Sequence, residues 1–230
     1  MSCFYLRKYF DLIGCWWFDG RYYEAPLNPY TVFRISPSII NKKSCDTPKC
    51  NSLRPSPVIG GDWDDNLVPF EQDVVYRSFH SRFIKGAPWK QTDYFQFMLD
   101  WIDQHGSYKG LFTDDQLEAR CSKLDELFDT IKNEGYSSQR ELSAKDTKLL
   151  DYGSHLPPER KEITVNVTRD GDFLWSGGAH RLTIAKLLGI ESIPVRIKMR
   201  HLRWQELRDE VYNGEREPDG TLQDHPDLQF

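Results

Sequence analysis

One stretch decides the fold: Trp175-Ser176-Gly177-Gly178-Ala179-His180-Arg181-Leu182-Thr183-Ile184-Ala185-Lys186-Leu187-Leu188-Gly189. Behind its two glycines, Leu182, Ala185 and Leu188 recur at the spacing of one helix face, which predicts a short helix. Gly189 follows the last of these apolar residues and is typical of a helix C-terminus. The stretch therefore predicts a strand end, a glycine turn and a helix in direct succession.

The flanks of this stretch predict β-structure. Before it, Ile163, Val165 and Val167 alternate with polar residues, which is the period of a half-buried strand. Residues 169–172 are typical of a hairpin turn, after which the chain returns as a second strand. Residues 194–199 alternate again. The predicted order is strand, hairpin, strand, two glycines, helix, strand.

The glycine turn has two interpretations. Glycines ahead of a helix let a ligand approach the backbone, and the first N–H groups of the helix favour anions. His180 and Arg181 would add donors that suit phosphate. In the alternative interpretation, Gly177 and Gly178 form a packing turn and Arg181 is a surface residue. The stretch alone does not decide between them.

The segment from Gly177 to Gly189, followed by Ile193-Pro194-Val195, resembles the phosphate-binding segment of the ParB/sulfiredoxin superfamily. ParB-type domains have a similar Gly-x-Arg-Arg-x-Arg-Ala helix start, and sulfiredoxins have Gly-Gly-Cys-His-Arg. The resemblance implies an α+β fold with a small mixed sheet and flanking helices. It also implies a nucleotide, ATP or CTP, whose phosphates would lie on Gly177, Gly178, Ala179, His180 and Arg181.

Two departures limit the resemblance. Ala179 stands where sulfiredoxin has its catalytic cysteine, and a methyl group cannot replace a thiol nucleophile, so sulfinic-acid reduction is excluded. Thr183 stands where ParB has its second helix arginine, which counts against ParB-type CTP chemistry.

A helix predicted from Thr113 to Gly135 extends the resemblance. Thr113 and Gln116 have the form of a capping box. The apolar stripe consists of Leu117, Cys121, Leu124, Phe128 and Ile131. ParB-like domains place such a helix before the phosphate loop, with polar residues behind it that contact nucleotide. The resemblance makes Gln139 and Arg140 candidate ligand contacts; ordinary surface residues are the alternative.

A second unusual stretch is acidic. Asp62, Asp64 and Asp65 follow two β-branched residues and two glycines. Three carboxylates within four residues repel one another unless they are solvated, paired or neutralised by a cation. The functional interpretation is that Asp62 and Asp64 hold Mg²⁺ or act as a general base facing the phosphate loop. The alternative is an acidic turn that caps the next helix.

Composition excludes several classes of partner. A net charge of −5 gives no general attraction to nucleic acid or to an anionic membrane. No apolar run approaches the roughly 20 residues that span a bilayer. The five cysteines lack regular spacing, which suits a reducing cytoplasm, and the one close pair, Cys45 and Cys50, argues against zinc because no second pair accompanies it. We therefore expect a cytoplasmic protein without membrane contact.

The expected organisation is one domain over residues 30–212, whose first strand is residues 30–35. An aromatic extension, residues 1–29, precedes it as an N-terminal helical elaboration, and a mobile tail, residues 213–230, follows. Residues 67–112 are expected to be a helical insertion, and residues 142–162 an insertion between the predicted helix and the hairpin. The basic residues between Arg196 and Arg208 are expected to be a solvated face, with a role towards anions as the alternative.

These observations predict a protein that binds a nucleotide or another phosphorylated ligand, with Mg²⁺ as a possible companion. Phosphoryl transfer or hydrolysis is compatible with this function, and whether the chain is an enzyme is left open. The alternatives are a DNA-associated ParB-like nuclease or adaptor, and a non-catalytic binding module. The acidic net charge and the lack of a helix-turn-helix pattern count against DNA.

Overall fold

The computed structural model describes residues 3–49, 56–145 and 157–230. Cys50 and most of the expected insertion at 142–162 lie outside the described residues. The chain divides into two compact units. The first, the sheet unit, comprises Met1–Val68, Ser138–Gly178 and Glu191–Phe230; the second, the helical unit, comprises Pro69–Ser137 and Ala179–Ile190.

The described residues form one mixed sheet of seven strands, with the order β1-β7-β5-β6-β2-β4 and with β3 also paired to β7. With helices in both units, this confirms the predicted α+β class. The strands are β1 (Val32–Ile35), β2 (Lys42–Ser44), β3 (Val58–Ile59), β4 (Leu67–Pro69), β5 (Ile163–Val167), β6 (Phe173–Gly177) and β7 (Ile193–His201). The helices of the sheet unit are α1 (Cys3–Cys15), α5 (Gln139–Ala144) and α7 (Leu202–Tyr212).

Strand β7 is the centre of the sheet. It pairs along one side with β5, in parallel, and along the other with β1, antiparallel, and then β3, in parallel. Strands β5 and β6 form the predicted antiparallel hairpin. The prediction of strands around residues 30–35, 163–167 and 194–199 is therefore confirmed, although β7 continues to His201.

The two faces of the sheet carry different residues. Directly paired residues share a face, so Val167, Phe173 and Arg200 lie on one face, whereas Asn166 and its partners Leu174 and Met199 lie on the other. Leu174 and Met199 form a buried cluster with Trp63. All five residues of β5 are buried, so this strand is covered on both faces and is not half-buried as the alternation predicted.

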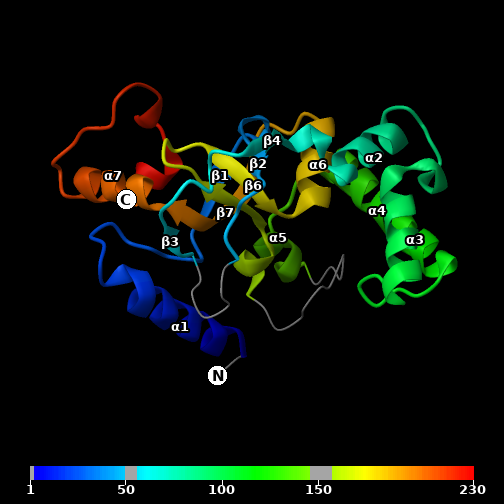
Figure 1. The fold of residues 1–230 in the computed structure, drawn as a ribbon, viewed down its shortest axis with the longest axis horizontal. Coiled ribbons are helices and arrows are strands. Elements are labelled where there is room, and N and C mark those ends of the chain that lie inside the picture. The colour runs from blue at the N-terminus through cyan, green and yellow to red at the C-terminus, as the bar shows by residue number, and fades with distance from the viewer. Residues whose placement is uncertain (1–2, 50–55, 146–156) are drawn as a thin grey trace. The chain divides into compact units, whose positions relative to one another are not determined.

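The helical unit consists of α2 (Val74–Phe83), α3 (Asp93–His105), α4 (Asp114–Glu134) and α6 (Ala179–Leu187) (Figure 1). The predicted cap at Thr113 is confirmed, because its hydroxyl accepts a hydrogen bond from the backbone at the start of α4, and Thr92 caps α3 in the same way. The predicted apolar stripe of α4 is buried throughout.

The helical unit is larger than the expected insertion at 67–112. It runs on to Ser137 and takes in residues 179–190, because α6 packs against α2 and α4. No helix among the described residues is both long and apolar enough to cross a membrane.

The C-terminal segment corrects the expectation of a mobile tail. Asp227 and Leu228 are buried on the sheet unit. The Asp227 carboxylate accepts hydrogen bonds from Arg200 at 2.9 and 2.6 Å and from Trp204 Nε1 at 2.8 Å. Because a buried guanidinium needs a counter-ion, Arg200 fixes a segment 27 residues further along the chain.

The basic end of the chain is likewise not the solvated face that we expected. Arg196, Arg200 and Arg208 are all buried. Arg196 donates to the Pro29 carbonyl at 3.2 Å, and Arg208 donates to the Asp227 carbonyl at 2.9 Å. Asp227 is the common partner of Arg200 and Arg208, whereas the Arg196 Nε has no hydrogen-bond partner among the described residues.

Candidate functional site

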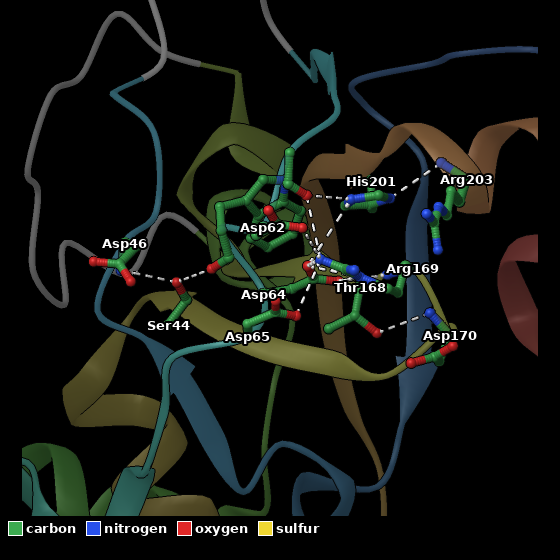
Figure 2. A network of polar contacts seen from close by, with 12 residues as sticks. Ser44, Asp46, Asp62, Asp64, Asp65, Thr168, Arg169, Asp170, His201 and Arg203 are labelled. Carbon is green, nitrogen blue, oxygen red and sulfur yellow. Dashed lines mark hydrogen bonds and ion pairs between the residues drawn. The ribbon is translucent and has the colours of Figure 1, made fainter.

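The acidic stretch lies in the loop between β3 and β4, and it meets the hairpin turn that joins β5 to β6. Figure 2 shows Asp62, Asp64 and Asp65 gathered around the guanidinium of Arg169, with His201 beside them. All five residues belong to the sheet unit. Sequence analysis did not single out Arg169 or His201, because Arg169 lies 105 residues beyond Asp64 in the chain.

Asp64 is the carboxylate that Arg169 holds most closely. The Arg169 Nε donates to the two carboxylate oxygens at 3.0 and 3.1 Å, and Nη2 donates at 2.5 Å. The Arg169 backbone N–H also donates to Asp64, at 2.8 Å. The same Nη2 lies 3.2 Å from Asp62 and 3.1 Å from Asp65, whose side chains are 81% and 61% exposed. One guanidinium thus neutralises a buried carboxylate and borders two exposed ones.

His201 closes the network from the end of β7. Its Nε2 lies 2.8 Å from the Gly61 carbonyl, and its Nδ1 accepts a hydrogen bond from the Arg203 backbone. Burial raises the pKa of Asp64, but the hydrogen bonds from Arg169 and the proximity of His201 outweigh it, so that this pKa lies below its ordinary value. Asp64 is therefore held as a carboxylate.

Of the states considered for the acidic stretch, pairing is the one observed for Asp64. The partner is the Arg169 guanidinium, and both oxygens of Asp64 already accept hydrogen bonds. In the part of the chain that the structure describes, no group of three acidic, histidine or cysteine side chains is arranged to hold a metal ion. Asp64 anchors the 169–172 turn, and its role as Mg²⁺ ligand or general base stays a prediction, as does that of Asp62.

The glycine turn joins β6 to α6 as predicted. Gly178 has a φ of +82°, and a Cβ there would lie 3.0 Å from Ile163 Cγ1 and 3.1 Å from Ile163 Cα. Side chains rarely adopt this φ, so both the backbone and the packing against β5 require glycine. Gly178 is nevertheless exposed. One side of the Gly178 backbone thus packs against Ile163, as the packing interpretation expects. The residue is also accessible to solvent, as the phosphate interpretation requires.

The remaining predicted residues of this loop, Ala179, His180 and Arg181, begin α6 in the helical unit. The His180 Nε2 lies 3.0 Å from the Tyr94 hydroxyl, and the imidazole stacks on Phe79 with ring centroids 5.5 Å apart. Burial, assisted by neighbouring cations, lowers the pKa of His180 to about 3. His180 is therefore a neutral, packed side chain and does not provide a positive charge.

Gln139 and Arg140 begin α5 in the sheet unit. Ser138 and Glu141 form a capping box there, and the Gln139 backbone N–H donates to Glu162 at 2.6 Å. Arg140 pairs with Glu159 at 3.2 Å, while 79% of its side chain is exposed. Both residues take part in local helix capping and pairing, and their predicted ligand contacts stay predictions.

Sequence analysis also missed Ser176 and Lys198. Lys198 was counted among the basic residues of an alternating strand, which indicates only a solvated face. It lies instead at an irregularity in β7, and its Nζ is 3.4 Å from the Ser176 hydroxyl. A β-bulge cannot be predicted from alternation, so nothing in the sequence pattern marked this pair.

Comparison with known proteins finds no match: no family model, no curated protein and no solved structure matches this chain.

Proposed function

We propose that the chain binds the phosphate of a nucleotide or of another phosphorylated small molecule at the segment Gly177–Arg181. The observation that carries the proposal is Gly178, an exposed residue without a side chain that directly precedes α6. The first turn of α6 contains no acidic residue. A helix start of this kind offers N–H donors and a partial positive charge to an anion.

Arg181 would contribute the directional contact. Its guanidinium offers a planar fork that a phosphate can meet at two points, whereas the neutral His180 adds no positive charge. The resemblance to ParB-like and sulfiredoxin-like loops supports the same ligand class, with ATP and CTP as the first nucleotides to test. ParB/sulfiredoxin-like membership of the chain is itself part of this proposal.

The proposal concerns binding. Phosphoryl transfer would require Asp62, Asp64 or another group as base or Mg²⁺ ligand, and the pairing of Asp64 with Arg169 favours a structural role for it. We therefore propose that the chain is a non-catalytic binding module.

A thermal-shift screen tests the proposed function. The chain is heated with pyrophosphate and with nucleoside di- and triphosphates, each with and without Mg²⁺. A ligand at 100 times its dissociation constant adds about 2.7 kcal/mol of stability. We expect at least one nucleotide or pyrophosphate to raise the melting temperature by several degrees. No shift with any of these compounds at millimolar concentration would contradict the proposal.

A further inference from the structure

Strands β6 and β7 each contain one irregularity in their pairing with β5. Both irregularities lie opposite residues 164–166 of β5, next to the proposed loop. In β6, Thr164 pairs with Gly177 and Val165 pairs with Trp175, so that Ser176 is an additional residue. In β7, Val165 pairs with Ile197 and Asn166 pairs with Met199, so that Lys198 is additional. Bulges re-aim side chains and often lie beside functional sites. Here both bulges flank the same three residues of β5.

The two additional residues contact each other. Lys198 Nζ lies 3.4 Å from Ser176 Oγ. Because β5 lies between β6 and β7, the lysine side chain must cross β5 to reach it. The face of Val165 is filled at this level by Val165 and its buried partner Ile197. We infer that Lys198 crosses on the opposite face, between Thr164 and Asn166.

Lys198 is a half-buried cation without a counter-ion: no carboxylate among the described residues forms an ion pair with it. A second positive charge, on the buried Arg196, stands two residues earlier on the same strand and opposite Thr164, and the Pro29 carbonyl and the nearby Asp11 carboxylate compensate it only in part. Taking cations out of water is costly unless an anion or a hydrogen-bond acceptor compensates. The local charge thus favours a negatively charged partner.

Asn166 gives an independent indication of a ligand. It is 1% exposed, and neither its amide nitrogen nor its amide oxygen has a hydrogen-bond partner among the described residues. Buried side-chain amides are almost always satisfied, so such a group calls for a bound water, ion or ligand. On the same strand, the buried Thr164 hydroxyl borders Gly177, where a Cβ would lie only 2.7 Å from the oxygen.

We propose that Ser176, Lys198, Thr164 and Asn166 form the subsite for the phosphate group, with Lys198 as its counter-charge and the hydroxyls and the amide as hydrogen-bonding partners. This rests on the proposed function and names further residues for it, all of them within the sheet unit. The ligand class is a phosphate or pyrophosphate group attached to a polar small molecule.

Isothermal titration of the full chain with pyrophosphate and with ATP tests the subsite. Lys198→Met removes the charge and keeps most of the stem, so it should weaken binding of both probes about ten- to a hundred-fold, because a charge-assisted contact is lost. Lys198→Arg should retain most of the affinity. The matched control is Lys123→Met, which removes an exposed charge on α4 and should change neither affinity nor melting temperature.

Asn166→Leu separates a ligand role from a structural one. If the amide has no partner in the free protein, an apolar side chain of similar shape should raise the melting temperature while it weakens pyrophosphate binding. Unchanged affinity would overturn its place in the subsite whatever the melting temperature does, and a lower melting temperature with unchanged affinity would show that Asn166 is structural.

The outcomes distinguish this proposal from the proposed function. If wild-type protein binds ATP and Arg181→Ala weakens that binding, but Lys198→Met does not, the phosphate site at Gly177–Arg181 is supported and the proposed subsite is contradicted. If Lys198→Met weakens pyrophosphate binding and the control does not, the subsite is supported. If neither pyrophosphate nor any nucleotide of the screen binds the wild type, both proposals are wrong.

Discussion

At the scale of the residue, Asp64 and Arg169 show how a buried charge can specify a turn. The carboxylate accepts hydrogen bonds from both the side chain and the backbone of Arg169, so it fixes the position and the conformation of the turn together. Its exposed neighbours Asp62 and Asp65 touch the same guanidinium at its edge. The three carboxylates therefore contribute unequally to the free energy of unfolding, although they lie within four residues of one another.

We expect Asp64→Asn to destabilise the protein by about 1–3 kcal/mol, because buried donors lose their charged acceptor. Asp62→Asn and Asp65→Asn are matched controls that should change stability by less than about 0.5 kcal/mol, as exposed pairs do. Urea unfolding measures all three. Equal effects for the three variants would contradict the assignment of Asp64 as the anchor.

The effect of Asp64→Asn should depend on pH. The pKa of Asp64 is lower in the folded chain than in the unfolded chain, where it is about 3.9. Its contribution is therefore complete above that pH and is lost as the pH falls through the folded pKa. The difference between wild type and variant should shrink below about pH 4 in the same unfolding experiment.

His180 gives a second pH dependence, from the helical unit. Its pKa is about 3 in the folded chain, against about 6.5 when unfolded. Below about pH 6.5, His180 is therefore protonated in the unfolded chain but stays neutral in the folded chain. The free energy of unfolding thus falls as the pH is lowered from about 6.5 towards 3, by at most about 1.4 kcal/mol per pH unit.

Replacing the imidazole should remove this slope. We expect the stability of His180→Gln to be less sensitive to pH than that of wild type between pH 6.5 and 5, as measured by chemical denaturation at a series of pH values. If stability changed with pH equally in wild type and in the variant, His180 would not be held neutral. A protonated His180 could then provide a positive charge to a phosphate.

At the scale of the element, the Asp227 carboxylate is the central buried contact of the C-terminal segment, which His225 also attaches through the Gly171 carbonyl at 3.0 Å. Asp227 receives hydrogen bonds from Arg200 and Trp204, and its side chain is 0% exposed. Arg208 donates to the carbonyl of the same residue. We expect Asp227→Ala to cost about 3–5 kcal/mol, because removing one partner leaves buried cations uncompensated.

Asp224→Ala is the matched control, because Asp224 is an exposed residue of the same segment and its loss should have little effect. Urea unfolding followed by tryptophan fluorescence would report both variants. A cost below about 1 kcal/mol for Asp227→Ala would show that the segment is held by other contacts.

The predictability of an element depends on how local its causes are. Helix α4 was predictable because its cap, its apolar stripe and its terminal Gly135 all lie within the helix or next to it. The hairpin of β5 and β6 was predictable for the same reason. The C-terminal segment was not, because its burial depends on Arg200, and an acidic, Gly- and Pro-containing sequence by itself resembles a tail.

The candidate site follows the same rule. The position of Gly178 before α6 could be predicted from adjacent residues, and the structure confirms it. The partner of Asp64 could not, because only the pairing of distant strands brings Arg169 beside it. The contact between Ser176 and Lys198 could not be predicted either, because a bulge breaks the alternation on which strand prediction relies.

At the scale of the whole molecule, charge argues against a role on DNA. The net charge is −5, and three arginines of the basic end, Arg196, Arg200 and Arg208, are buried. Few cations of that end remain to release counterions from a duplex. We expect no retention of random duplex DNA tighter than the usual non-specific range of roughly 10⁻⁴–10⁻⁶ M at about 150 mM salt. Sub-micromolar, salt-sensitive retention in a filter-binding assay would contradict this.

The most direct test of the central claim is isothermal titration of folded Arg181→Ala with the nucleotide that stabilises the wild type most. A charge-assisted hydrogen bond contributes about 1.5–3 kcal/mol, so we predict an affinity about ten- to a hundred-fold weaker, with partial recovery in Arg181→Lys, which keeps the charge but loses the fork. If Arg181 is only structural, the melting temperature falls and the affinity does not change. Unchanged affinity in the folded variant would contradict a phosphate site at the start of α6.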